Sequence, residues 1–179
     1  MLKRIAAILL IVFSLSLQSC VSTVAGLKSF VDSYDGYQFL YPNGWVPVQV
    51  SSGPDVVLHD LIEETENVSV VISPVPEGKT LAEIGTPSEV GYKLSKNAIA
   101  PPDSGRTAEL VNAEAHEAGD KTFYILEYAV KLPNQDRHNL ASVIVRRGQL
   151  FTLNLSTSEV RWQKAEPLFR QVVDSFDVY

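Results

Sequence analysis

The sequence predicts an α+β domain in which a central antiparallel β-sheet is sandwiched by helices. Residues 37–41 and 68–73 alternate between apolar and polar side chains, as strands with one buried face do. The second half contains two hairpin patterns, and helical patterns occupy separate blocks at 80–100 and 158–176. Strands joined by hairpins, with helices in blocks of their own, are typical of this class. The chain has 179 residues, 45% of them hydrophobic, which suits one domain and a short N-terminal segment.

The N-terminal segment is predicted to be a signal peptide, residues 1–19. Lys3 and Arg4 precede an apolar run over residues 5–17, which is shorter than the roughly 20 residues that a membrane-spanning helix needs. The run ends in Leu-Gln-Ser-Cys, which resembles the lipobox of bacterial lipoproteins. We therefore expect Cys20 to carry a lipid that attaches the mature chain to a membrane. The alternative is an ordinary signal peptide, which leaves Cys20 as a free thiol.

The mature chain is predicted to have a flexible tether over residues 20–32 and a folded domain over residues 33–179. Cys20 is the only cysteine, so the fold has no internal disulfide. Removal of residues 1–19 leaves 13 basic and 21 acidic residues, so the formal charge falls from −6 to −8. This charge disfavours nucleic acid and favours basic surfaces or cations. We expect a monomer.

The first predicted strand of the domain ends at a turn. Tyr37, Phe39 and Tyr41 share one face of a strand that ends at Pro42-Asn43-Gly44, and Trp45 follows as a core residue. Residues 55–62 and 67–75 predict two more strands, joined by an acidic turn.

Helical signals follow. Thr80 and Glu83 form a capping-box pattern, and Pro87 begins a second helical stretch that ends before Pro101. Trp162 and Phe169 belong to an amphipathic C-terminal helix that contains Pro167. We assign the aromatic side chains of this helix and of the first strands to the core.

Two hairpins are predicted in the second half. The first joins residues 107–118 to residues 121–132 through Gly119-Asp120. The second joins residues 137–146 to residues 149–158 and turns about Arg147-Gly148, where glycine supplies a positive φ.

Three segments together resemble the PsbP family, the extrinsic lumenal proteins of photosystem II. They are GYQFLYPNGW (36–45), RHNLASVIVRRGQLFTLNLSTSEVRW (137–162) and FRQVVDSF (169–176). With a lipobox, the chain is most similar to the cyanobacterial lipoprotein members. The resemblance implies an antiparallel sheet between helices, a place on the lumenal side of the thylakoid membrane, and support of the oxygen-evolving complex or its assembly. It also argues for a protein that is not an enzyme.

Motifs of catalysis are missing from the sequence: it has no phosphate-binding glycine loop, no His-Glu-x-x-His and no Gly-x-Ser-x-Gly. Three histidines are the available neutral-pH bases, and no pattern fixes a Ser-His-Asp set. We expect no required cofactor.

A divalent-cation site is predicted at His138 and Glu159. If the second hairpin turns about Arg147-Gly148, His138 lies opposite Thr157 and within reach of Glu159. An imidazole and a carboxylate suit zinc or manganese better than calcium. The family has a histidine and an acidic residue at the matching positions, which resembles a proposed cation site. The alternative is that His138 forms hydrogen bonds only.

Weaker candidates lie elsewhere. Glu114 and His116 are two apart on a strand and share a face, whereas His59 and Asp60 are adjacent and point to opposite faces. Arg146 and Arg147 form the one tight basic pair of the mature domain. They are candidates for binding an acidic partner, although a hairpin tip needs polar residues in any case.

Two functions follow from these observations. The first is a lipid-anchored lumenal protein that docks on photosystem II subunits and assists assembly or stability of the oxygen-evolving complex. The second is a metal carrier or sensor of the lumen.

Overall fold

The computed structural model describes residues 26–179. The predicted signal peptide, the lipobox and Cys20 lie outside these residues. Within the described part of the chain, no helix has both the length and the hydrophobicity to cross a bilayer.

The centre of the fold is a seven-stranded antiparallel sheet with the strand order β3-β4-β5-β9-β8-β7-β6. Its strands are β3 (Trp45–Pro47), β4 (Val56–Asp60), β5 (Asn67–Pro74), β6 (Thr107–Ala118), β7 (Lys121–Leu132), β8 (Gln135–Arg146) and β9 (Gln149–Ser158). A second sheet has the order β1-β2-β10. Its strands are β1 (Leu27–Asp32), β2 (Tyr37–Pro42) and β10 (Asp177–Val178).

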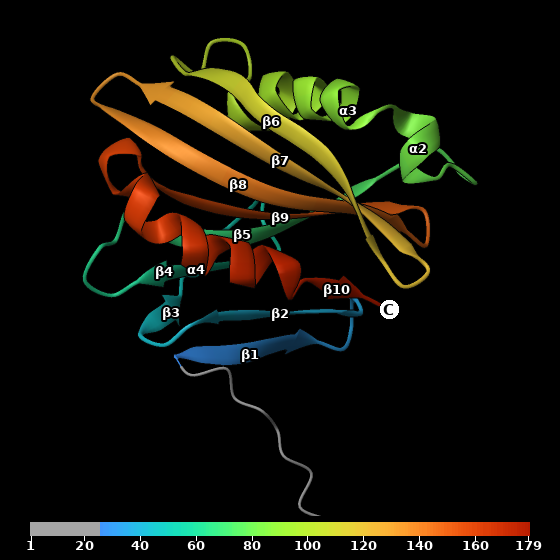
Figure 1. The fold of residues 1–179 in the computed structure, drawn as a ribbon, viewed down its shortest axis with the longest axis horizontal. Coiled ribbons are helices and arrows are strands. Elements are labelled where there is room, and N and C mark those ends of the chain that lie inside the picture. Colours follow the sequence, from blue (N-terminus) through green and yellow to red (C-terminus); the bar gives the residue numbers. More distant parts are fainter. Residues whose placement is uncertain (1–25) are drawn as a thin grey trace, which may run out of the picture.

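Helical segments lie on both faces of the large sheet (Figure 1). One face packs against α2 (Leu81–Ile84), α3 (Pro87–Leu94) and the π-helix η1 (Ser95–Ile99). The other face packs against α4 (Trp162–Asp174), with the small sheet beyond it, and the 3₁₀ helix η2 (Glu159–Arg161) leads into α4. The structure therefore confirms the α+β sandwich.

Both hairpins have the predicted turns. Arg146 pairs with Gln149 across Arg147-Gly148, and Ala118 pairs with Lys121 across Gly119-Asp120. Arg147 and Gly148 both have positive φ angles, of 51° and 71°. Two successive positive φ angles match the right-handed twist of the strands that such a turn connects.

The helix starts are also confirmed. Thr80 and Glu83 form a reciprocal capping box before α2. A second capping box joins Thr86 and Glu89 and places Pro87 in the first turn of α3. The helix α4 continues through Pro167.

Alternation along the strands divides the core into two parts. The aromatic residues assigned to the core are buried on the α4 side, except for Tyr41, which is half-buried. On the other face, Leu126, Tyr128 and Val143 pack under Leu81 and Val90 of the helical layer. Each face of the sheet thus has its own hydrophobic core.

The predicted tether is too long at its C-terminal end. Residues 27–32 form β1, which pairs with β2 from Leu27 opposite Pro42 to Asp32 opposite Tyr37. Phe30 stacks on Phe39 with the ring centroids 5.1 Å apart, and Leu27 is buried. This apolar contact brings residues 27–32 into the domain, which begins before residue 33.

Arg147 has a role inside the domain. Its guanidinium donates to the backbone oxygens of Asp35 and Tyr179, and it lies 5.7 Å from the centroid of the Phe151 ring. It therefore joins the β8–β9 turn to the β1–β2 turn and to the C-terminal residue. Two of its five N–H groups are thus engaged within the domain, and binding of an acidic partner by Arg147 stays a prediction.

We predict that Gly36→Ala destabilises the domain by about 2–3 kcal/mol in urea denaturation. Gly36 has a φ of +68°, and a Cβ there would lie 2.5 Å from an Arg147 guanidinium nitrogen. The substitution therefore strains the backbone and displaces Arg147.

Gly119→Ala is the matched control. Gly119 has a φ of +66°, and no atom lies within 4 Å of a Cβ built on it. This variant pays only the backbone cost, about 1 kcal/mol. Equal losses in the two variants would contradict a stabilising role for Arg147.

Candidate functional site

A buried histidine with a carboxylate on each side lies where β8 passes under α4. His138 is 5% exposed. Its Nδ1 is 2.9 Å from Glu159 Oε2, and its Nε2 is 2.9 Å from Glu127 Oε1. A neutral imidazole has one N–H, so it can donate to only one of these carboxylates at a time.

Two residues of α4, Trp162 and Arg170, hold the site in place. The indole of Trp162 stacks on the His138 ring, with the centroids 4.0 Å apart and the planes 12° from parallel. Arg170 lies 3.6 Å from the second oxygen of Glu127 and also donates to Glu166 from its Nε. The imidazole is therefore held in one orientation by an aromatic plane and by its contacts with two carboxylates.

Four elements supply these side chains, namely β7, β8, η2 and α4. The predicted register holds, with His138 opposite Thr157, and Glu159 follows two residues later at the start of η2. The predicted meeting of His138 and Glu159 is confirmed. Whether a cation binds there stays a prediction.

Sequence reasoning missed Glu127. It lies on β7, where Ala129 is the residue opposite His138, and Glu127 is the next residue on the same face. An acidic residue in the otherwise apolar run of β7 was the available signal, because a buried carboxylate needs a partner.

The two sides of His138 differ in access to solvent. The side chain of Glu127 is 13% exposed and that of Glu159 is 46% exposed. A carboxylate that holds one ring nitrogen fixes the tautomer and leaves the other nitrogen as a metal ligand. The arrangement therefore allows a cation between Nδ1 and Glu159, with Glu127 as the orienting carboxylate.

A second network joins η2 to the turn between β4 and β5. The buried carboxylate of Glu66 accepts from Arg161 Nε at 2.6 Å and from the Thr157 hydroxyl at 3.0 Å. Arg161 also lies 3.5 Å from Glu63. These contacts hold η2 against the β4–β5 turn.

Apolar residues project from the segments that this network joins. Ile62 is 89% exposed, Val160 is 93% exposed, and Leu61 is also exposed. Each is next to, or two residues from, a residue of the ion-pair network. We call these three residues the apolar tip. In Figure 1, the β4–β5 turn and the start of α4 lie at the same end of the molecule.

Within residues 26–179, the other candidate metal ligands named above do not form a cluster of three ligand residues. Glu114 and His116 are both exposed on β6. Asp60 accepts the backbone N–H groups of Ile62 and Glu63, and these hydrogen bonds lower its pKa despite partial burial. His59 is half-buried on β4, opposite Val46.

A cluster of three aspartates was not predicted. Carboxylate oxygens of Asp32, Asp35 and Asp55 lie within 4.8 Å of one another. Asp32 accepts the N–H groups of Tyr34 and Asp35, and the Tyr37 hydroxyl donates to Asp55. Desolvation, followed by the charges of Asp55 and Asp32, raises the pKa of Asp35.

Arg146 remains at the surface of the β8–β9 turn. Its guanidinium is 3.6 Å from Asp120 at the tip of the neighbouring hairpin, and both side chains are exposed. Such pairs contribute little to stability, so Arg146 stays a candidate for partner binding.

Comparison with known proteins decides the family. The PsbP family model matches residues 25–178. The chain belongs to the PsbP family. The match begins two residues before β1, in agreement with a domain that includes this strand.

Curated relatives match most or all of this chain. CyanoP of Thermosynechococcus vestitus is 53% identical over 184 residues, with 100% of both chains covered. PsbP-like protein 1 of Arabidopsis thaliana is 38% identical, over 86% of this chain and 65% of that protein. The solution structure of CyanoP from Synechocystis matches with a TM-score of 0.76 and 46% identity, over 92% of this chain and 99% of that one. As a PsbP-family member, the chain is a photosystem II-associated protein.

Proposed function

We propose that this chain is a lipid-anchored protein of the thylakoid lumen that docks on photosystem II and assists assembly or stability of the oxygen-evolving complex. The full-length match to CyanoP carries this proposal. It covers the N-terminal residues that contain the lipobox as well as the folded domain. A docking role without catalysis agrees with the absence of catalytic motifs from the sequence.

Cys20 supplies the membrane attachment in this proposal. β1 begins at Leu27, so few residues separate the lipid from the domain. A short linker keeps the domain close to the membrane and raises its effective concentration near a partner. A docking surface of modest size is then sufficient.

The apolar tip is the docking surface. Ile62 and Val160 give it an exposed apolar centre, and Glu63, Glu64 and Glu159 surround that centre with carboxylates. The Arg161–Glu66 ion pair holds its two segments together before binding, so little conformational entropy is lost on docking. An apolar centre with an acidic rim fits a partner surface that is apolar and edged by basic side chains.

We predict that the double variant Ile62→Ser, Val160→Ser reduces co-purification with photosystem II complexes at least tenfold. The measurement uses the full chain after solubilisation in mild detergent, when the lipid no longer concentrates it near the partner. Both side chains are almost fully exposed, so the substitutions leave the fold intact.

Tyr34→Ser is the control. Tyr34 is 95% exposed in the β1–β2 turn, at the other end of the molecule from the apolar tip. This variant keeps normal co-purification. Retention of the double variant at the level of the unmodified chain would refute docking through the tip.

His138 and Glu159 hold a divalent cation in this proposal, with water completing the coordination. A tetrahedral zinc ion places its ligand atoms about 3.3 Å apart, and the two atoms are 2.9 Å apart. A small outward rotation of the exposed Glu159 side chain makes the space. The buried imidazole suits a site that holds its ion more than a carrier that must load and release one.

We predict that His138→Ala abolishes zinc binding in calorimetry on the full chain, and that Glu159→Gln weakens it at least tenfold.

Two comparisons complete the zinc experiment. Glu159→Gln keeps Glu127, Trp162 and the buried ring in place, so its effect is not one of unfolding. His116→Ala removes an exposed histidine on β6 and leaves binding unchanged. Unchanged zinc binding by His138→Ala would exclude this site.

A further inference from the structure

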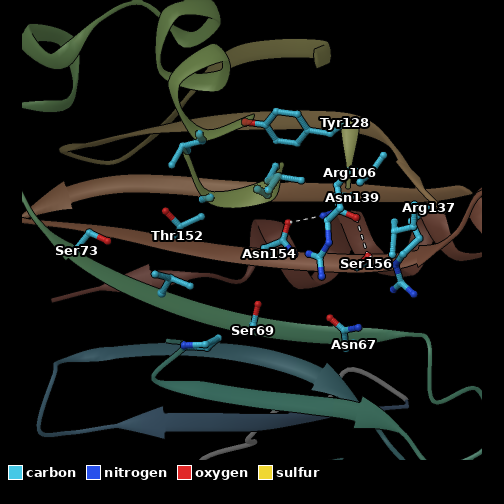
Figure 2. Close-up of a pocket in the computed structure, with 18 of the residues that line it drawn as sticks. Asn67, Ser69, Ser73, Arg106, Tyr128, Arg137, Asn139, Thr152, Asn154 and Ser156 are labelled. Atoms are coloured by element: carbon cyan, nitrogen blue, oxygen red, sulfur yellow. Dashed lines mark hydrogen bonds between the residues drawn. The ribbon is translucent and has the colours of Figure 1, made fainter. Parts of the chain in front are cut away.

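A cavity of about 480 Å³ lies on the face of the large sheet that is turned away from α4. Figure 2 shows its floor, which β5, β9 and β8 form, and the helical segment above it. The volume lies within the range of small-molecule sites. Neither the docking surface nor the His138 site includes any residue that lines it.

The cavity exists because the helical layer covers only part of this face. Leu126 and Val143 of β7 and β8 are buried under α2 and α3. Farther along the sheet, the residues on the same face are small and polar, with Ser69 on β5 and Thr152 and Asn154 on β9. A solvent-exposed sheet face explains small polar residues, but it does not explain the charges found there.

Those charges belong to two arginines, neither of which makes an ion pair with a carboxylate of residues 26–179. Arg106 and Arg137 line the cavity, and none of its lining residues is acidic, although the chain has 21 acidic and 15 basic residues. Figure 2 shows both arginines, with Asn67, towards the same end of the pocket. A cavity with this charge selects an anion.

The arginines keep donors available. Within residues 26–179, the guanidinium of Arg106 makes no hydrogen bond or ion pair. Arg137 uses two of its five N–H groups, on Ser156 and on the backbone oxygen of Thr65. Burial, followed by the charge of Arg106, lowers the pKa of Arg137. Glu66, the carboxylate that opposes this effect, is engaged by Arg161 and Thr157.

A chain of hydrogen bonds fixes the floor of the cavity. Arg137 Nε donates to Ser156, Ser156 donates to Asn139 at 2.7 Å, and Asn139 donates to Asn154 at 3.3 Å. Asn139 and Ser156 are buried. The polar end of the cavity is thus organised before any ligand binds, which lowers the entropic cost of binding.

Apolar side chains also line the cavity. Leu94 and Ile99 line the cavity from the helical layer, and Leu132 and Leu150 line it from the sheet. Tyr128 also lines it, while its hydroxyl donates to Gly91 of α3. One end therefore offers cationic donors and the helical layer offers apolar contact, while the floor also carries small polar side chains such as Thr152.

We propose that this cavity binds an amphiphilic organic carboxylate of small-molecule size. The carboxylate lies between Arg106 and Arg137, and the apolar part of the ligand lies under η1 against Leu94 and Ile99. Guanidinium groups are well matched to carboxylates because they donate two parallel hydrogen bonds. This binding is independent of docking through the apolar tip, which lies outside the cavity.

The test is photolabelling of the full chain with 4-benzoylbenzoate, compared with the neutral amide 4-benzoylbenzamide. The two probes have nearly the same shape and differ in charge. Labelled peptides are identified by mass spectrometry. We expect the carboxylate to label η1 and strands β5 and β7–β9, and to reach half-saturation at a concentration at least tenfold lower than the amide.

Three variants locate the binding. Arg106→Gln raises the half-saturating concentration of the carboxylate about tenfold and leaves the amide unchanged. Ser69→Trp fills the cavity without replacing either arginine, and it abolishes labelling by both probes. Arg146→Gln removes one positive charge from a distant hairpin tip and changes neither probe.

Three results would overturn the proposal. They are labelling confined to other segments, carboxylate labelling that Ser69→Trp leaves intact, and equal half-saturation of the two probes in the unmodified chain. Arg106→Gln is preferred to an Arg137 variant because Arg137 also bonds Ser156 and Thr65, so its loss would disturb the fold.

Discussion

The register of β8 against β9 is the constraint on which the rest of the structure depends. The turn at Arg147-Gly148 has two positive φ angles and sets Arg146 opposite Gln149. Every later pair follows from that one, as far as His138 opposite Thr157. A slip of one residue would send each side chain to the other face of the sheet. His138 would then leave Glu127 and Trp162.

Alternation along β8 gives the two faces different chemistry. Arg137 lines the cavity under η1, and His138, the next residue, lies under Trp162 between two carboxylates. On the α4 side, Trp162 of the helix stacks on the imidazole, which has almost no access to solvent. On the other side, the helical layer stops before β5 and β9 and leaves a cavity. The helices bury most of one face of the sheet and only part of the other. A polar residue of β8 is therefore buried with polar partners on the α4 side, whereas on the other side it lines the cavity.

Much of the fold could be predicted because it follows local rules. Capping boxes, turn glycines and strand alternation act over a few residues, and they predicted the start of α2, both hairpins and the meeting of His138 with Glu159. The internal role of Arg147 could not be predicted, because its partners Asp35 and Tyr179 lie far away in the chain. The same reason applies to the presence of Arg106 and Arg137 in one cavity. Glu127 was missed because the pairing of β7 with β8, which places it beside His138, was not predicted. Strand β1 was missed because its six residues mix polar and apolar side chains without a clear alternation, and they form a strand through contact with β2.

We propose that this PsbP-family domain docks on photosystem II through the end that bears η2 and the β4–β5 turn. The most direct measurement places a photoreactive amino acid at position 160 of the full chain in native thylakoid membranes and identifies the crosslinked proteins. The same residue at position 34 serves as the comparison. We expect adducts with lumenal subunits of photosystem II from position 160 and not from position 34. Adducts only with proteins unrelated to photosystem II, or equal adducts from both positions, would contradict this proposal.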